Sequence, residues 1–221
     1  MSEVSTVDYR SPDGPEIFTD SLQKTGFAVL ANHPLEASLV RTVYSDWASF
    51  FAGDAKFDYL FDPEKQDGYF PFLSENAKGY SVKDLKEFYH VYPWGRYPEE
   101  IGDQTRILYD RLVALAAELL EWVERDTPGE VRRGFSVPLT EMIDGSSRNL
   151  LRVIHYPPLT GEEEEGAVRA APHEDINLIT LLVAGTEPGL RVKDLEGNWH
   201  DVACDYGTIV VNAGDMLQMC S

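Results

Sequence analysis

The stretch Pro172-His173-Glu174-Asp175-Ile176-Asn177-Leu178-Ile179-Thr180-Leu181-Leu182 sets a histidine and a carboxylate two residues apart, directly ahead of an apolar run. The run over residues 176–183 is short and rich in aliphatic residues, which predicts a buried strand. Side chains alternate between the two faces of an extended chain, so we expect His173 and Asp175 to point the same way. Glu174 is expected to point to the other side.

One imidazole and one carboxylate on the same side suit Fe(II). A second histidine would complete a site of two histidines and one carboxylate. A His-x-Asp triplet also arises by chance, as a surface pair at the entrance of a strand. The context favours a metal, because a charged pair at the edge of a buried sheet needs solvent, a partner or a metal ion. Both interpretations stay open on these residues alone. His33 and His90 are expected to be structural and His200 exposed, so none of them is a strong candidate for the third ligand.

The composition predicts one folded domain that does not bind polyanions. The chain has 221 residues, of which 43% are hydrophobic and 11% aromatic, enough for a sizeable core. Its 38 acidic and 19 basic residues give a net charge of −19, which disfavours nucleic acid and anionic membrane surfaces as partners. Two cysteines, Cys204 and Cys220, suggest no disulfide framework and fit a reducing compartment. The sequence shows no basic and apolar leader and no run of about 18 apolar residues, so we expect a cytoplasmic protein.

The periodicity of apolar residues changes along the chain. Three-and-four spacing predicts helices over residues 15–25, 35–51 and 98–125, with Gly26 ending the first of them. A short buried strand is expected at 27–31, and irregular structure with short strands at 52–97.

The later part of the chain has a different pattern. Short apolar or β-branched runs separated by turn signals predict an all-β sandwich or barrel, with strands at 150–156, 176–183, 190–192, 199–202, 208–211 and 216–219. We expect a single domain over 1–221, in which a helical and irregular flanking region, 1–148, precedes a β core, 149–221.

Two further segments carry polar side chains in apolar surroundings. If Leu151–Pro158 begins as a strand, Arg152 and Tyr156 share one face and His155 takes the other. A phenol beside a metal could donate a hydrogen bond to a carboxylate, but a packed ring with an outward hydroxyl fits Tyr156 equally well. His155 is expected to be structural. Residues 208–217 are expected to form a strand, a turn and a strand, with the turn formers Asn212, Gly214 and Asp215 in structural roles.

Five segments, in this order, resemble the iron(II)- and 2-oxoglutarate-dependent dioxygenase superfamily, in its isopenicillin-N-synthase-like branch. They are Thr25–His33, Lys83–Glu87, Arg152–Pro158, His173–Leu182 and Asn212–Leu217. The resemblance implies a mainly β fold with flanking helices, the double-stranded β-helix or jelly roll. It also implies that the last strands, a distal histidine and an Arg-x-Ser pair that binds 2-oxoglutarate fall beyond Ser221.

The same resemblance implies roles for particular residues. It makes His173 and Asp175 two of three iron ligands and Tyr156 a contact to the carboxylate of 2-oxoglutarate or of the substrate. Ile154 stands where many relatives have asparagine. Isoleucine cannot donate a hydrogen bond, so the contacts that hold 2-oxoglutarate must differ. The implied reaction uses Fe(II), 2-oxoglutarate and O2 to hydroxylate, desaturate or cyclise a small molecule, with release of succinate. The alternatives are an oxidase of the same branch that works without 2-oxoglutarate, and a non-catalytic protein of the same fold.

Overall fold

In a computed structural model of the chain, residues 4–76, 81–183, 185–193, 197–202, 205 and 207–220 are described. The chain divides into two compact units that alternate along the sequence. The first unit comprises Met1–Ala37, Asp110–Asp144 and Glu174–Ser221, and the second comprises Ser38–Tyr109 and Gly145–His173. The single domain with a boundary at residue 148 stays a prediction.

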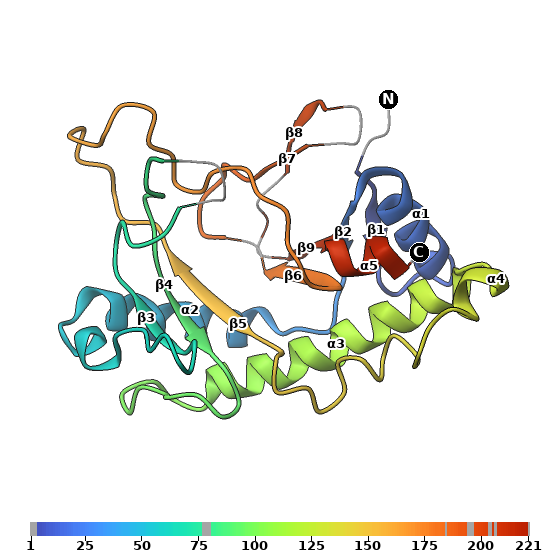
Figure 1. The fold of residues 1–221 in the computed structure, drawn as a ribbon, viewed down its shortest axis with the longest axis horizontal. Coiled ribbons are helices and arrows are strands. Elements are labelled where there is room, and N and C mark those ends of the chain that lie inside the picture. Colours follow the sequence, from blue (N-terminus) through green and yellow to red (C-terminus); the bar gives the residue numbers. More distant parts are fainter. Residues whose placement is uncertain are drawn as a thin grey trace. The chain divides into compact units, whose positions relative to one another are not determined.

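The first unit contains a four-stranded sheet with the strand order β1-β2-β9-β6 (Figure 1). Strand β1 runs parallel to β2, whereas β9 is antiparallel to both of its neighbours. One face of β2 and β9 lies in the core, because the paired residues Ala28 and Val211, and Leu30 and Ile209, are fully buried. A separate antiparallel pair joins β7 to β8. The strands of this unit are β1 (Thr6–Asp8), β2 (Phe27–Ala31), β6 (Ile179–Val183), β7 (Arg191–Lys193), β8 (Trp199–Asp201) and β9 (Thr208–Ala213).

Helix α1 (Gly14–Thr25) precedes β2, as the sequence predicted. Pro15 lies in its first turn. The N–H groups at the start of a helix have no carbonyl partner within it, so proline, which lacks an N–H, costs no helical hydrogen bond there. Gly26 ends the helix in the left-handed conformation, with a φ of 78°, and its N–H donates to the carbonyl of Leu22. The predicted helix over 15–25 and the predicted strand over 27–31 are confirmed.

Helix α3 (Gln104–Asp126) begins later than the helix predicted over 98–125. Residues Pro98 to Ile101 form a turn instead, in which the N–H of Ile101 donates to the carbonyl of Pro98 at 3.1 Å. Ile101 is 5% exposed, so the turn buries it without making it helical. A short helix, α4 (Gly129–Arg132), follows α3.

The second unit contains the antiparallel sheet β3-β4-β5. Helix α2 covers one face of it, because Trp47 and Phe50 pack against Tyr89 with ring centroids 5.0 and 5.6 Å apart. The opposite face carries Phe88 and His90 of β4, paired with Ile154 and Arg152 of β5. The elements of this unit are α2 (Ala37–Ala52, whose first residue belongs to the first unit), η1 (Ala55–Tyr59), β3 (Gly68–Phe70), β4 (Glu87–Val91) and β5 (Leu151–His155).

The strand predicted at 216–219 is wrong, because the structure has a helix there, α5 (Asp215–Cys220). The N–H of Gln218 donates to the carbonyl of Gly214 at 3.2 Å, as in a helical turn. Leu217 is 5% exposed and Met219 86% exposed, so the segment buries only part of its apolar run. An apolar run this short fits a helix and a strand equally well by periodicity.

Within the described residues, no helix is both long enough and apolar enough to cross a lipid bilayer. Cys220 is a free thiol in the same part of the chain. Cys204 lies outside the described residues.

Candidate metal centre

His173 and Asp175 lie in an irregular segment that precedes β6, which begins only at Ile179. The expectation that both side chains point the same way therefore concerns a segment outside any assigned strand, and it stays a prediction. Ile176, expected inside the strand, is 76% exposed. The boundary between the two units falls directly after His173. His173 therefore belongs to the second unit and Asp175 to the first.

The second unit fixes the tautomer of His173. Nδ1 of His173 lies 2.9 Å from the carbonyl oxygen of Ala171. Because a carbonyl only accepts, Nδ1 carries the proton, and the neutral ring has its lone pair on Nε2. The N–H of Ala171 in turn donates to Oδ1 of Asp84 at 3.1 Å, and Lys86 donates to Oδ2 of Asp84 at 2.7 Å. Asp84 is 2% exposed, so a buried ion pair anchors the peptide that orients His173.

The first unit holds the carboxylate of Asp175. Its Oδ2 accepts hydrogen bonds from Oγ1 of Thr180 at 2.6 Å and from Nδ2 of Asn212 at 3.0 Å. Asn177 donates to Oγ1 of Thr180 at 2.8 Å, which directs the hydroxyl proton of Thr180 toward Asp175. These bonds set the orientation of the carboxylate, as the outer partners of a metal site do.

The segment after β9 holds the backbone near Asp175. The N–H of Asp215 donates to the carbonyl of Asp175 at 2.8 Å, and the N–H of Gly214 donates to the carbonyl of Leu178 at 2.9 Å. A Cβ atom at Gly214 would overlap the backbone carbonyl of Asn177, so the close approach requires glycine. Gly214 and Asp215 therefore have the structural role predicted for them.

Asn212 has a role that sequence reasoning missed. It was predicted to form a turn, but it lies within β9, paired with Thr180 of β6. Its amide reaches Asp175 from that position. A polar residue at the end of an otherwise apolar strand, beside an expected ligand strand, was the signal that could have revealed it.

The donor chemistry fits a ferrous ion. His173 presents an imidazole with its lone pair on Nε2, and Asp175 presents a carboxylate oriented by hydrogen bonds. Two such ligands belong to the set that non-haem Fe(II) uses. Among the described residues, no group of three histidine, cysteine, aspartate or glutamate side chains is placed to hold a metal ion.

Three other histidines have structural partners. His33 Nδ1 accepts from the N–H of Leu35 at 3.3 Å. His155 lies 2.7 Å from Oε1 of Glu87 and stacks on Phe51, in keeping with its expected structural role. His90 accepts a bond from Arg152 at 3.0 Å.

Tyr156 follows the last residue of β5 and is 40% exposed. Burial of its hydroxyl raises the pKa of Tyr156, and the charge of Asp84 adds to this rise, whereas Arg152 and Arg169 oppose it. The phenol is therefore neutral at pH 7 and can donate a hydrogen bond. The guanidinium of Arg169 lies over its ring, 5.9 Å from the centroid.

Two regions of the chain match known families. Residues 147–221 match the 2OG-Fe(II) oxygenase superfamily, and residues 16–109 match the N-terminal region of the non-haem dioxygenases in morphine synthesis. The crystal structure of a candidate oxygenase from Shewanella oneidensis is 51% identical, with a TM-score of 0.89 over 99% of this chain and 79% of that one. The chain belongs to the 2OG-Fe(II) oxygenase superfamily. Its fold is accordingly the jelly roll with flanking helices that the resemblance implied.

Other relatives of the superfamily extend the comparison. Proline hydroxylase buaE of Petromyces alliaceus is 28% identical over 98% of this chain and 76% of its own length. Gibberellin 2-beta-dioxygenase 1 of Pisum sativum is 24% identical over 99% of this chain and 68% of its own length. A full-length Neurospora crassa protein, solved in complex with α-ketoglutarate (2-oxoglutarate), is 25% identical, with a TM-score of 0.76 over 96% of this chain and 73% of that one. The chain is therefore an oxidoreductase of the 2-oxoglutarate-dependent dioxygenase type, a family whose cofactors are Fe(II), 2-oxoglutarate and O2.

Proposed function

We propose that this chain binds Fe(II) through Nε2 of His173 and the carboxylate of Asp175, and that it oxidises a small molecule with 2-oxoglutarate and O2 as cosubstrates. The outcome is hydroxylation, desaturation or ring closure of the substrate, with release of succinate. The observation that carries the assignment of ligands is the pair of supporting networks, which fix the tautomer of His173 and orient Asp175. Metal sites use such outer partners to hold their ligands.

The protein's own residues bind, orient and donate in this reaction. Ala171 keeps the proton of His173 on Nδ1, and Thr180 and Asn212 hold the carboxylate of Asp175 in one orientation. Tyr156 donates its hydroxyl proton in a hydrogen bond to the carboxylate of 2-oxoglutarate or of the substrate. When bound, Fe(II) supplies the chemistry that couples O2 to the decarboxylation of 2-oxoglutarate and to oxidation of the substrate.

The same proposal makes a small molecule the partner of the protein, and neither nucleic acid nor a membrane. The net charge of −19 supports this, because it repels phosphate backbones and anionic lipids. The reducing compartment suggested by the small number of cysteines supports a cytoplasmic location.

Anaerobic titration of the protein with Fe(II), followed by an assay for succinate, tests the ligand assignment. We expect His173→Ala and Asp175→Ala to abolish both Fe(II) binding and succinate formation. Glu174→Gln is the matched control, since it changes the residue between the two ligands and should leave both unchanged. Normal turnover in either ligand variant would remove the assignment. Oxidation of a substrate without succinate would favour the oxidase, and no Fe(II) binding by the unmodified protein would favour a non-catalytic protein.

A further inference from the structure

The segment Lys83–Glu87 is one of those that resemble the superfamily, and the proposed function gives no residue of it a part in binding. It leads into β4 in the second unit and carries two buried carboxylates, since Asp84 is 2% exposed and Glu87 is 4% exposed. A buried carboxylate is costly unless it is paired and hydrogen-bonded. The partners of Asp84 and Glu87 therefore show which parts of the unit these two side chains hold in place.

Asp84 holds the stretch of chain that leads to His173. Its Oδ1 accepts the N–H of Ala171 at 3.1 Å, and the N–H of Leu85 donates to the carbonyl of Val168 at 2.9 Å. A side-chain bond and a backbone bond thus tie this stretch to the segment before β4. The carbonyl of Ala171 is the group that lies 2.9 Å from Nδ1 of His173, so the same peptide joins Asp84 to the imidazole.

Glu87 holds the end of β5, directly before Tyr156. Its Oε1 lies 2.7 Å from Nδ1 of His155, and the two residues are partners in the ladder between β4 and β5. Burial raises the pKa of Glu87, but the hydrogen bonds that it accepts outweigh burial, so that the pKa is lowered. The donors are Tyr69, His155 and Lys56. The carboxylate is therefore ionised, and because it only accepts, Nδ1 of His155 donates the proton.

The loop between these two anchored points is closed at its base. Nη1 of Arg169 donates to the carbonyl of Pro157 at 3.1 Å, and its guanidinium lies over the ring of Tyr156. Asp84 also acts on Tyr156, whose pKa is raised first by burial and then by the charge of Asp84. Tyr156 and His173 begin and end this loop. Bonds to one short segment of the chain therefore fix both ends of it.

We propose that the two carboxylates of this segment are positioning residues, which together set the place of the His173 imidazole relative to the Tyr156 phenol. Asp84 acts through the peptide two residues before the ligand, and Glu87 acts through the imidazole that precedes the phenol. Both roles depend on the proposed function, in which the imidazole binds Fe(II) and the phenol donates to a carboxylate. Outer partners hold the ligands of metal sites in the same way.

Two pairs of variants separate the two anchors. Asp84→Ala removes the acceptor for the N–H of Ala171, and Asp84→Asn keeps an oxygen for it. His155→Phe keeps a ring to stack on Phe51 but loses the bond to Glu87, whereas His155→Asn keeps an N–H donor. Each conservative variant should restore part of what its partner loses.

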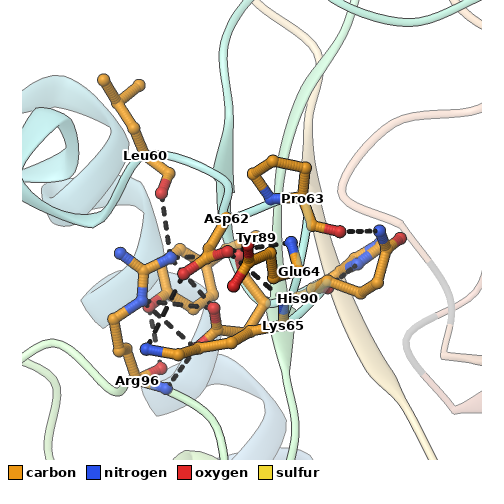
Figure 2. Close-up of polar contacts among 10 residues, drawn as sticks. Leu60, Asp62, Pro63, Glu64, Lys65, Tyr89, His90 and Arg96 are labelled. Carbon is orange, nitrogen blue, oxygen red and sulfur yellow. Dashed lines mark hydrogen bonds and ion pairs between the residues drawn. The ribbon is translucent and has the colours of Figure 1, made fainter.

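Asp67→Ala is the matched control. Asp67 is 1% exposed, accepts the backbone N–H of Arg96 at 2.6 Å and pairs with the guanidinium of Arg96 at 2.9 Å (Figure 2). A backbone N–H and a cation are also the partners of Asp84. In the loop before Asp67, the carbonyl of Gln66 lies 3.1 Å from Nδ1 of His90, so the control disturbs the other end of β4. An effect of lost stability alone should appear in this variant as well.

The first measurement needs no metal. Nitrogen-15 NMR of the metal-free protein reports the tautomer of His173, whose signals are those missing from His173→Ala. We expect Asp84→Ala to give a mixture of the two tautomers, and His155→Phe and Asp67→Ala to keep the proton on Nδ1. Anaerobic titration should then show Fe(II) binding weakened about tenfold in Asp84→Ala, and within about twofold of the unmodified protein in the other two variants.

The second measurement follows the phenol relative to the metal. The protein is prepared with 3-fluorotyrosine and saturated with Co(II), or with Zn(II) as a diamagnetic reference. The difference between the two fluorine shifts of residue 156, identified by its absence in Tyr156→Phe, depends on distance and direction from the metal ion. We expect this difference to change in Asp84→Ala and in His155→Phe, to recover in part in the conservative variants, and to stay the same in Asp67→Ala.

An unchanged shift difference in Asp84→Ala or in His155→Phe would overturn the joint role, and so would an equal change in Asp67→Ala. An unchanged tautomer in Asp84→Ala would overturn the part assigned to Asp84. If Asp84→Ala or His155→Phe does not fold, the conservative variant takes its place and must show a smaller change in the same direction. Failure of the unmodified protein to bind Fe(II) contradicts the proposed function, whereas the tautomer of His173 in the metal-free protein still tests Asp84.

Discussion

Among single residues, the two donors to Asp175 are the most direct means of testing the metal centre. Thr180 and Asn212 both donate to Oδ2, so removing either one leaves the carboxylate less well oriented. Losing such an outer partner costs about 10- to 100-fold in metal affinity at other sites. We expect Thr180→Val and Asn212→Ala each to weaken Fe(II) binding by about tenfold, measured by anaerobic titration.

Thr42→Val is the control for this change, because Thr42 is an exposed residue of α2 whose hydroxyl bonds only locally, to the carbonyl of Ser38. It should bind Fe(II) as the unmodified protein does. The d–d spectrum of bound Co(II) gives a second measure, which should change in Thr180→Val and not in Thr42→Val. Unaltered affinity and spectrum in both donor variants would show that Asp175 needs no outer support.

His90 gives a pH dependence of stability whose direction follows from its pKa. The pKa of His90 falls from 6.5 to about 4 on folding, chiefly through burial and further through the charge of Arg152. The unfolded chain then binds the proton more readily, so stability is lost as the pH falls from 6.5 towards 4, by up to about 3 kcal/mol.

Chemical denaturation at several pH values between about 6.5 and 4.5 measures this loss. His90→Gln removes the titrating group and keeps polar atoms beside Gln66 and Arg152, so its free energy of unfolding should change less over the same interval. Tyr92, whose ring lies 6.1 Å from that of His90, stays neutral throughout because burial raises its pKa. Equal slopes in the variant and the unmodified protein would assign the pH dependence to other groups.

The candidate ligands could be proposed from sequence because their spacing and the apolar run after them are local features. His173, Asp175 and Tyr156 still stand as predictions. The partners of these residues could not be found in this way, since Asn212 comes from a distant strand and is brought to Asp175 only by the pairing of β6 with β9. His90 was expected to be structural, and its bond to Arg152 depends on the register between β4 and β5.

Among the elements, the turn between β9 and α5 depends on glycine at position 214. A Cβ atom there would overlap the carbonyl of Asn177, and the backbone on both sides is tied by hydrogen bonds to residues 175–178. We expect Gly214→Ala to lower the free energy of unfolding by roughly 1–3 kcal/mol, the usual cost of forcing extra atoms into a packed region. Urea denaturation measures the change.

Gly53→Ala is the matched control, because a Cβ atom at Gly53 would meet its nearest neighbour at an ordinary 3.6 Å. It should leave stability within about 0.5 kcal/mol of the unmodified protein. Gly214→Ala should also weaken Fe(II) binding, since the same turn holds the backbone of Asp175. A variant that loses stability but keeps its metal affinity would show that the turn does not position the ligand.

Elements with strong local signals were predicted well, and elements that depend on the rest of the fold were not. Helix α1 has Pro15 at its start and Gly26 at its end, so local conformation alone defines it. Helix α5 has no comparable stop signal in its apolar run, and its N-terminal backbone is set by hydrogen bonds to the segment around Asp175. The prediction of a strand there failed because tertiary contacts decided a segment whose periodicity was ambiguous.

Over the whole molecule, the dominant electrostatic feature is the excess of acidic residues. A net charge of −19 at pH 7 places many like charges within reach of each other, and this repulsion opposes the folded state. The ion pairs that counter it include exposed ones, such as Lys24 with Asp20, which contribute little, and buried ones, such as Lys86 with Asp84, which salt screens weakly. Salt therefore removes more repulsion than attraction.

We expect the midpoint of thermal unfolding at pH 7 to rise as NaCl increases from ~0.01 M to ~0.15 M, because the screening length falls from about 30 Å to about 8 Å. Calorimetry or circular dichroism measures the midpoint. The control is the same pair of salt concentrations near pH 4.5, close to the isoelectric point of the sequence, where the net charge vanishes and the rise should largely disappear. An equal rise at both pH values would point to salt acting on apolar hydration. A fall at pH 7 would mean that attraction between oppositely charged side chains outweighs the repulsion among the acidic ones.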